Sequence, residues 1–192
     1  MMVKICGITN LEDALAAGEG GAAALGFNFW PRSPRYIGPE SARRLIEKLP
    51  SEVRKVGVFV DEKPGVVAAI VKETGIDVAQ LHGRETANDF PEGLRVWKAI
   101  RIGKEFDRTT LDDFPAEAVL LDGPSNGVPF DWTIAAGIPR KVIVAGGLDA
   151  QNVGRAIEQA RPWGVDVCSR IESAPGKKDH GKMAQFLKAA LG

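Results

Sequence analysis

The regular alternation of short apolar segments with helix-length segments is the feature that most constrains how this chain folds. The apolar segments are rich in Val, Ile, Leu, Ala and Phe and are predicted to be strands. They lie at residues 3–6, 24–29, 55–60, 78–81, 95–100, 118–121, 142–145 and 165–168. Such alternation is typical of right-handed βαβ crossovers and a parallel sheet. Eight units indicate an α/β fold of the (β/α)₈ TIM-barrel type rather than an open doubly wound sheet.

The segments between these strands differ in length and in helical pattern. Helices are predicted at residues 11–17, 39–48, 64–74, 152–160 and 182–191, with shorter helical turns ending at Asp89 and at residues 109–114 and 130–136. Because 192 residues is close to the lower limit for such a barrel, we expect some helices to be reduced to single turns. The chain contains no linker or shift in composition, so residues 1–192 are predicted to form one small domain.

The composition restricts the kinds of partner that the chain can have. Lys and Arg together number 25, as do Asp and Glu, so no excess of positive charge favours nucleic acid. No apolar run reaches transmembrane length, and the amino terminus lacks a long apolar leader segment. The two cysteines, Cys6 and Cys168, are far apart without metal-ligand spacing, which favours a reducing environment. We therefore expect a cytoplasmic protein that binds neither nucleic acid nor membranes.

A barrel of this type brings the loops that follow its strands to one face, where catalytic groups collect. The chemically competent residues in these loops are Cys6, Arg35, His82, Asp122, Gly146, Gly147, Ser169 and Arg170. The pairs Gly146-Gly147 and Ser169-Arg170 follow the seventh and eighth strands, the usual position of a barrel phosphate site, where backbone N–H groups can face an anion. Paired glycines are also common in ordinary turns, so the prediction of a phosphate site depends on their position at the end of the seventh barrel strand.

Two of these residues are suited to proton transfer. Cys6 ends the first strand, just before Gly7 turns the backbone and Thr9 or Asn10 caps the next helix. A reactive thiolate and an inert buried thiol are both compatible with that position. Asp122 ends an apolar strand, where partial burial suits a carboxyl group to general acid catalysis; capping of the following loop is the simpler alternative.

Two further residues are candidates for substrate binding. Arg35 lies in a loop stiffened by Pro31 and Pro34, where a guanidinium group is well placed to grip a substrate carboxylate. An ordinary surface position is the alternative, and it fits the nearby Arg32 better. His82 is a candidate pH-active group, although a histidine near a turn is more often a hydrogen-bonded structural residue.

Motifs along almost the whole chain resemble those of the phosphoribosylanthranilate isomerase family of tryptophan biosynthesis. They are KICGIT at 4–9, GFNFWPRSPRYI at 26–37, VGVFVD at 56–61, QLHG at 80–83, LLD at 120–122, FDW at 130–132, AGGL at 145–148 and VDVCSRIESAPGKKDH at 165–180. Several of these motifs are specific in combination, so the resemblance predicts both the barrel and its activity.

The resemblance implies an Amadori rearrangement, in which N-(5-phosphoribosyl)anthranilate becomes the corresponding 1-amino-1-deoxyribulose phosphate. It also implies that Cys6 is the general base and Asp122 the general acid, and that Arg35 binds the anthranilate carboxylate. The glycine pair 146–147 and the backbone after the eighth strand would hold the phosphate, and Asp166 would support the ribose. The expected partner is a small phosphosugar substrate, with no metal or other cofactor. The resemblance leaves the oligomeric state undecided between a monomer and a homodimer.

Two departures from the family pattern concern substrate binding. The loop between the LLD and FDW motifs is usually long and glycine-rich, whereas here it comprises only residues 123–129. After the eighth strand the family usually reads Ser-Ser-Gly, whereas this chain has Cys168-Ser169-Arg170. Glycine allows close backbone approach to a phosphate, so Arg170 would either hinder binding or add a charged contact of its own.

Two alternatives to this activity are considered. Another phosphosugar isomerase or lyase on the same barrel is the first, because a fold alone does not determine function. A catalytically weak or silent phosphoribosyl-binding barrel is the second, and the two departures favour it. The presence of both Cys6 and Asp122 argues against a silent barrel.

Overall fold

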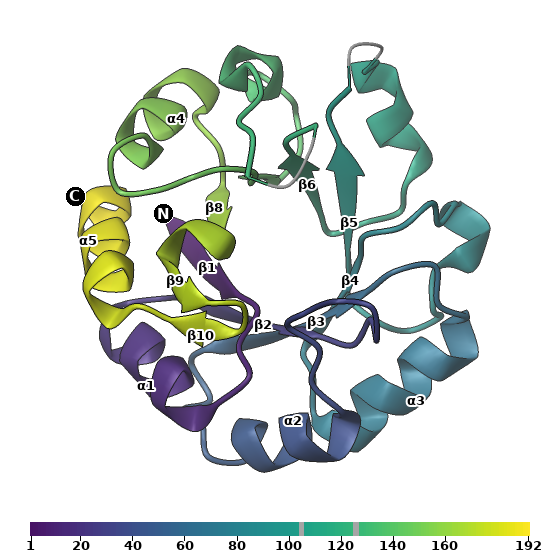
Figure 1. The fold of residues 1–192 in the computed structure, drawn as a ribbon. Coiled ribbons are helices and arrows are strands. Elements are labelled where there is room, and N and C mark those ends of the chain that lie inside the picture. Colours follow the sequence, from purple (N-terminus) through teal and green to yellow (C-terminus); the bar gives the residue numbers. More distant parts are fainter. Residues whose placement is uncertain (104–105, 125–126) are drawn as a thin grey trace.

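Eight parallel strands form a closed barrel in the order in which they occur along the chain. The structure is a computed structural model that describes residues 1–103, 106–124 and 127–192. In Figure 1 the strands form the inner ring, and the helices α1 to α5 surround it. The first strand pairs with both the second and the eighth, so the ring has no free edge. The predicted (β/α)₈ barrel is therefore confirmed.

The strands of the barrel are β1 Met2–Cys6, β2 Ala24–Asn28, β3 Arg54–Phe59, β4 Val78–Leu81, β5 Val96–Arg101, β6 Ala118–Asp122, β7 Val142–Val144 and β8 Gly164–Val167. The helices are α1 Leu11–Glu19, α2 Pro39–Ile46, α3 Pro64–Thr74, α4 Val153–Ala160 and α5 His180–Leu191. Short 3₁₀ segments occupy Ala87–Asp89, Arg108–Asp113, Trp132–Ala135 and Ser169–Ile171. The predicted short helical segments are thus 3₁₀ turns, as expected for a chain too short to build a full helix after every strand.

Local signals account for the helix ends. Asn10 caps α1, with its side chain accepting a hydrogen bond from the backbone of Asp13 at 2.8 Å. Proline stands in the first turn of α3, and Gly75 follows its last residue in the left-handed conformation. Asp179 caps α5, which begins at His180 rather than at the predicted residue 182.

A small antiparallel hairpin after the eighth strand was not predicted. Its strands, β9 Glu172–Ala174 and β10 Lys177–Lys178, are too short to show an alternating pattern in the sequence. Asp13 on α1 fixes the hairpin to the barrel wall, since its carboxylate accepts hydrogen bonds from the backbone of Lys178 and contacts His180, both at 2.8 Å. The hairpin thereby holds Glu172 and Lys178 at fixed positions.

The barrel has two separate apolar cores. Residues at alternate strand positions, such as Trp97, Ala99 and Leu120, form one buried cluster, which fills the interior. The intervening strand residues pack outward against the helices, together with residues such as Phe186 of α5. None of the described helices is long and apolar enough to cross a lipid bilayer.

The inward-facing positions become polar toward the carboxyl ends of the strands. On β1 the inward series is Met2, Lys4 and Cys6; on β4 it is Val78, Gln80 and His82; on β8 it is Gly164, Asp166 and Cys168. The apolar members belong to the interior cluster or fit close to it, whereas Lys4, Gln80 and Asp166 are buried polar residues. The barrel thus places buried charge directly beneath its carboxyl-terminal face.

The packing of α3 gives a stability test with a neighbouring control. Val67 is 0% exposed, whereas Val66 on the same helix is 40% exposed. We expect Val67→Ala to lower the free energy of unfolding by about 1.5–2.5 kcal/mol, because two buried methyl groups are lost. Val66→Ala should change it by less than about 0.5 kcal/mol. Urea denaturation of both variants measures the difference, and equal losses would show that α3 packs through a different face.

Candidate active site

Cys6 stands at the end of β1 in a space that neighbouring glycines leave open. Its partner across the β1–β2 pair is Gly26. A Cβ atom at Gly26 would lie 2.8 Å from Cys6 Sγ and 3.1 Å from Lys4 Cε, so a larger residue would collide with both side chains. Glycine at this position therefore lets Lys4 and Cys6 lie side by side on the inner face of β1.

Lys4 and Asp166 form a buried ion pair beneath this face. The two residues are register partners on β1 and β8, and Lys4 Nζ donates a hydrogen bond of 2.8 Å to Asp166 Oδ1. Burial alone acts to lower the pKa of Lys4, but the charges of Asp166 and Cys6 outweigh it and the pKa is raised. Burial raises the pKa of Asp166 to about 7, against the opposing attraction of Lys4.

The two thiols are shifted in opposite directions. The adjacent Cys168 thiol contributes most to lowering the pKa of Cys6 well below its ordinary value, and the charges of Lys4 and Lys178 act in the same direction against burial. The adjacent Cys6 in turn raises the pKa of Cys168 well above its ordinary value, and burial adds to this. These opposite shifts favour ionisation at Cys6 over ionisation at Cys168.

Arg35 lies in a network with Glu172 and Lys178. Its Nε and Nη2 atoms donate to Glu172 Oε1 and Oε2 at 2.9 Å and 2.6 Å, and Lys178 Nζ lies 3.0 Å from Glu172 Oε1. Burial acts to raise the pKa of Glu172, but the hydrogen bonds from Arg35 and Lys178 outweigh it and hold the pKa below its usual value. The pKa of Arg35 is raised, mainly by its hydrogen bonds with Glu172. Arg35 is therefore a fixed, paired residue rather than a free surface arginine.

Asp122 and His82 face each other across the mouth of the barrel. His82 Nε2 lies 3.3 Å from Asp122 Oδ2, although the two atoms are not aligned as a hydrogen bond. On the other side of the imidazole, His82 Nδ1 lies 3.4 Å from Nε2 of the buried Gln80. Asp122 Oδ1 accepts a hydrogen bond of 2.9 Å from Gly123 N. His82 is thus both hydrogen-bonded and adjacent to the predicted acid.

The predicted phosphate residues lie at the ends of β7 and β8. Gly146 and Gly147 adopt positive φ angles of 82° and 67°, which favour glycine. A Cβ atom at Gly147 would lie 2.6 Å from the carbonyl oxygen of Gly127, so the short loop packs directly on this turn. Ser169 and Arg170 are exposed, and Arg170 Nη2 donates a hydrogen bond of 3.1 Å to that same carbonyl. Residues 125–126 of the short loop lie outside the described residues.

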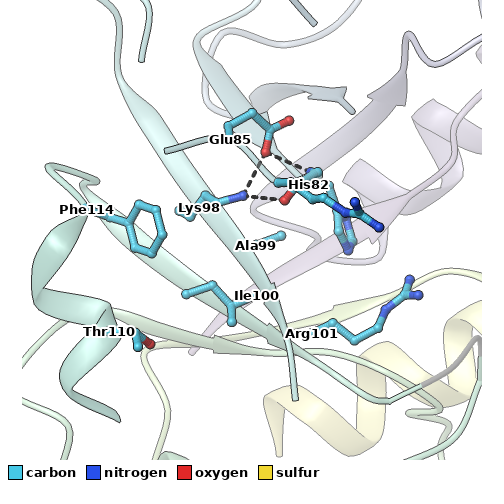
Figure 2. A pocket seen from close by; sticks show the side chains of 10 residues that line it. His82, Glu85, Lys98, Ala99, Ile100, Arg101, Thr110 and Phe114 are labelled. Carbon is cyan, nitrogen blue, oxygen red and sulfur yellow. Dashed lines mark hydrogen bonds and ion pairs between the residues drawn. The ribbon is translucent and has the colours of Figure 1, made fainter. Parts of the chain in front are cut away.

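A pocket of about 260 Å³ opens beside His82, between the ends of β4 and β5 and the 3₁₀ turn Arg108–Asp113. Cys6 and Arg35 are not among its lining residues, so it adjoins the mouth rather than forming its centre. Figure 2 shows Lys98 and Glu85 pointing toward each other in its wall, with the ring of Phe114 nearby; their Nζ and Oε2 atoms are 2.7 Å apart. Glu85 also accepts from the backbone of Asp61 and Gly83, both at 2.8 Å, and so ties together the loops after β3 and β4.

The structure brings the predicted residues to one end of the barrel. The pKa of Asp166 is raised by burial and, to a smaller extent, by the charges of Cys6 and Asp122, which places all three within electrostatic reach of one another. The charge of Cys6 likewise contributes to the raised pKa of Arg35. Within residues 1–103, 106–124 and 127–192, no group of three or more His, Cys, Asp and Glu side chains is arranged to hold a metal ion.

Sequence reasoning missed several residues of this site. They are Lys4, Gln80, Cys168, Glu172 and Lys178. The first three could have been found from the two-residue period of their strands. Lys4 and Gln80 occupy inward positions on β1 and β4, and Cys168 is the next inward position after the end of β8. Glu172 and Lys178 had no such signal, since the hairpin that carries them leaves no periodic pattern in the sequence.

The arrangement places a thiol with a lowered pKa and a carboxyl group at the same mouth. Arg35 lies next to Gly7, which follows the thiol, and the glycine turn after β7 lies beside the carboxyl group of Asp122. Such a site is suited to moving protons on a small molecule that carries negative charge at both ends.

Comparisons with known proteins agree with this description. A sequence model of the family described as N-(5'phosphoribosyl)anthranilate (PRA) isomerase matches residues 3–189. The N-(5'-phosphoribosyl)anthranilate isomerase of Solibacter usitatus is 55% identical over 201 residues, covering 100% of both chains.

Solved structures are similar over the same length. A phosphoribosyl anthranilate isomerase crystallised in complex with reduced 1-(o-carboxyphenylamino)-1-deoxyribulose 5-phosphate is 40% identical, with a TM-score of 0.86 and coverage of 100% of this chain and 98% of that one. A structure of monomers generated from the dimeric enzyme of Thermotoga maritima has the same identity, TM-score and coverage.

The buried ion pair gives a pH-dependent test of the site. Lys4→Met leaves Asp166 buried without its cation, which should cost about 3–5 kcal/mol of unfolding free energy when Asp166 is ionised. Without Lys4 the folded-state pKa of Asp166, already about 7, should rise further above its unfolded value. The folded state then keeps a proton that the unfolded state releases, so stability falls as pH rises.

Urea denaturation at pH 5 and pH 9 measures this effect. Lys4→Met should lower the free energy of unfolding by a larger amount at pH 9 than at pH 5. The double variant Lys4→Met/Asp166→Leu, which removes both charges, should recover most of the loss at pH 9. An equal loss at the two pH values would contradict a titrating Asp166.

Proposed function

The chain belongs to the N-(5'-phosphoribosyl)anthranilate isomerase family, the aldose–ketose isomerases of tryptophan biosynthesis, and from that premise we propose which of its residues perform the reaction. The substrate is N-(5'-phosphoribosyl)anthranilate, and the product is 1-(2-carboxyphenylamino)-1-deoxyribulose 5-phosphate. Cys6 is the general base and Asp122 the general acid. The observation that carries this assignment is the environment of Cys6, which favours a thiolate at the same mouth as Asp122.

Asp122 begins the reaction as the acid. Its carboxyl group protonates the ring oxygen of the furanose, and the nitrogen lone pair expels that oxygen to open the ring to a protonated Schiff base. The adjacent His82, whose Nε2 lies 3.3 Å from Asp122 Oδ2, keeps the carboxyl group oriented toward the substrate. A proton transfer of this kind contributes roughly 10²–10⁴-fold to the rate.

Cys6 then acts as the base. Its thiolate removes the proton from C2 of the Schiff base, and the electron pair of the C–H bond forms the C1–C2 double bond of an enolamine. Protonation at C1 and loss of the C2 hydroxyl proton give the ketone. The nearby Lys4 ammonium stabilises the thiolate before the transfer, which favours the basic form of Cys6.

Binding of the substrate is assigned to the two anion-binding regions. Gly146 and Gly147, the backbone at Ser169 and the guanidinium of Arg170 bind the phosphate. This assignment is supported by the positive φ angles of both glycines and by the position of Arg170 beside the same turn. A guanidinium has five N–H donors, so its hydrogen bond to Gly127 leaves others for a phosphate.

The remaining predicted residues contact the other parts of the substrate. Arg35 binds the anthranilate carboxylate, and its Nη1 atom makes no hydrogen bond with the described residues. Asp166 and His82 face the ribose; Asp166 Oδ2 and His82 Nε2 are likewise without hydrogen-bond partners there. The active form is a monomer or a homodimer, as the Thermotoga maritima relative is described in both forms.

Removal of the acid or the base tests the assignment. Cys6→Ser and Asp122→Asn should each lower kcat by roughly 10²–10⁴-fold, because each removes one positioned proton-transfer group. Both variants should still bind a product analogue as the parent does. The fall in fluorescence of freshly made phosphoribosylanthranilate measures turnover. Either variant retaining near-parent kcat, with chemistry rate-limiting, would remove that residue from its role, and a parent that binds without turnover would indicate a silent barrel.

Replacement of Arg170 tests the phosphate assignment. Arg170→Gly and Arg170→Ala should raise KM by roughly 10–100-fold with a smaller effect on kcat, because a charge-assisted contact made equally in the ground and transition states is lost. The effect should shrink as salt concentration rises. Arg44→Ala, which changes an exposed arginine on α2, serves as the control. Parent-like or tighter binding by Arg170→Gly would contradict the assignment.

A further inference from the structure

We propose that Glu172 is a positioning residue for substrate binding, whose carboxylate holds Arg35 in the orientation that presents Nη1 to the anthranilate carboxylate. The proposal rests on the proposed role of Arg35. Glu172 does not contact the substrate and acts through Arg35. This role gives a function to the small hairpin of β9 and β10, which the sequence did not predict.

Glu172 binds one edge of the Arg35 guanidinium. Nε donates hydrogen bonds to both carboxylate oxygens, at 2.9 Å and 3.1 Å, and Nη2 donates to Oε2 at 2.6 Å. This pairing fixes the plane of the guanidinium through the edge formed by Nε and Nη2. Nη1 has no hydrogen-bond partner among the described residues, so its two N–H groups and the second N–H of Nη2 are left at the end of the group. That end can bind a second carboxylate through two parallel hydrogen bonds.

The aliphatic stem of Arg35 is fixed as well. A Cβ atom at Gly7 would lie 2.8 Å from Arg35 Cδ and 3.4 Å from Cγ, so the stem lies against the backbone that follows Cys6. Only the absence of a side chain at Gly7 permits this approach. The Arg35 side chain is 22% exposed and that of Glu172 only 5%. The arginine is therefore the member of the pair that a ligand can reach.

The hairpin holds Glu172 in place before any ligand binds. Gly176 N and Lys178 Nζ donate to Glu172 Oε1 at 3.2 Å and 3.0 Å. The Lys178 side chain is fully buried, and its backbone N–H donates to Asp13 Oδ2 at 2.8 Å. Because Asp13 is a buried residue of α1, this contact anchors the hairpin to the barrel wall.

Lys178 also decides how much charge Arg35 keeps for a ligand. A single arginine paired with a single glutamate would largely cancel its charge, whereas here two cations share the carboxylate of Glu172. Pairing with Glu172 therefore orders Arg35 without removing its attraction for an anion. A long side chain that is already ordered loses less conformational entropy when a ligand binds than a mobile one does. The network thus supplies affinity through preorganisation.

A change that keeps the charge but shortens the side chain tests the proposal. The carboxylate of Glu172→Asp cannot reach Arg35 and the hairpin donors together. Two probes are compared by titration calorimetry: the product with its ketone reduced to an alcohol, and the same compound with hydrogen in place of the aromatic carboxylate. We expect Glu172→Asp to weaken binding of the first probe by roughly 3–10-fold and of the second by less than about twofold, because one long side chain must now be ordered on binding. Glu47→Asp, which changes an exposed partner of Arg43, is the matched control and should leave both affinities unchanged.

Selectivity for the carboxylate separates positioning from a structural role. Parent-like binding of the first probe by Glu172→Asp would overturn the proposal, and so would an equal loss for both probes. Arg35→Met should itself weaken binding of the first probe selectively, and adding Glu172→Asp should then cause no further selective loss. A further loss in that background would show that Glu172 acts without Arg35 and would also overturn the proposal.

The Arg35→Met variant distinguishes failure of this proposal from failure of the proposed function. If Arg35→Met bound the first probe as the parent does, the carboxylate assignment of Arg35 would be wrong and this proposal would fall with it. If Arg35→Met lost affinity selectively while Glu172→Asp did not, only the role of Glu172 would be wrong.

The unsubstituted protein supplies a second measurement that needs no variant to fold. Nitrogen-15 NMR follows exchange of the arginine Nε–H hydrogens with water in the absence of ligand. The Nε–H of Arg35 should exchange far more slowly than that of the exposed Arg32, because Glu172 already binds it. Equal exchange rates at the two arginines would overturn preorganisation by Glu172.

Discussion

The pairing of β1 with β8 closes the barrel, and the candidate site depends on that one pairing. It joins strands separated by about 160 positions in the sequence and aligns Lys4 with Asp166. The same register carries Cys6 to the side of Cys168 at the next inward position. An open sheet built from the same strands would leave both pairs at opposite edges, with their charges unpaired.

Closure also explains how so much charge is tolerated in the interior. The cations Lys4, Arg35 and Lys178 lie among the carboxylates of Asp166 and Glu172 and the thiol of Cys6, so the cluster is balanced when Asp166 and Cys6 are both ionised. Removing a single member of a buried cluster leaves an uncompensated charge, and its neighbours then change their protonation. The raised pKa of Asp166, about 7, places one member close to that change near neutral pH. The charge that favours a thiolate at Cys6 is therefore a property of the whole cluster.

The two departures from the family pattern meet at one point in space. The short loop packs its Gly127 carbonyl against the turn at Gly147, and Arg170 donates to the same carbonyl. Arg170 therefore braces the loop as well as lying beside the proposed phosphate site. This contact links the shortening of the loop to the presence of arginine, because a glycine at 170 would provide no such brace.

The sequence by itself determined the eight strands, the barrel and the chemically competent residues at the strand ends. It did so because strand alternation, helix caps and turn glycines are local signals, and because the motifs around Cys6 and Asp122 are specific. Only the tertiary structure decided what surrounds Cys6. Cys168 acts on it from the neighbouring strand end and Lys178 from a hairpin without a sequence period, while Lys4 on the same strand is held by Asp166 of β8; such contacts depend on register and closure rather than on local pattern. The ionisation of a buried group is set by the charges that folding places around it, so no single segment of the chain contains that information.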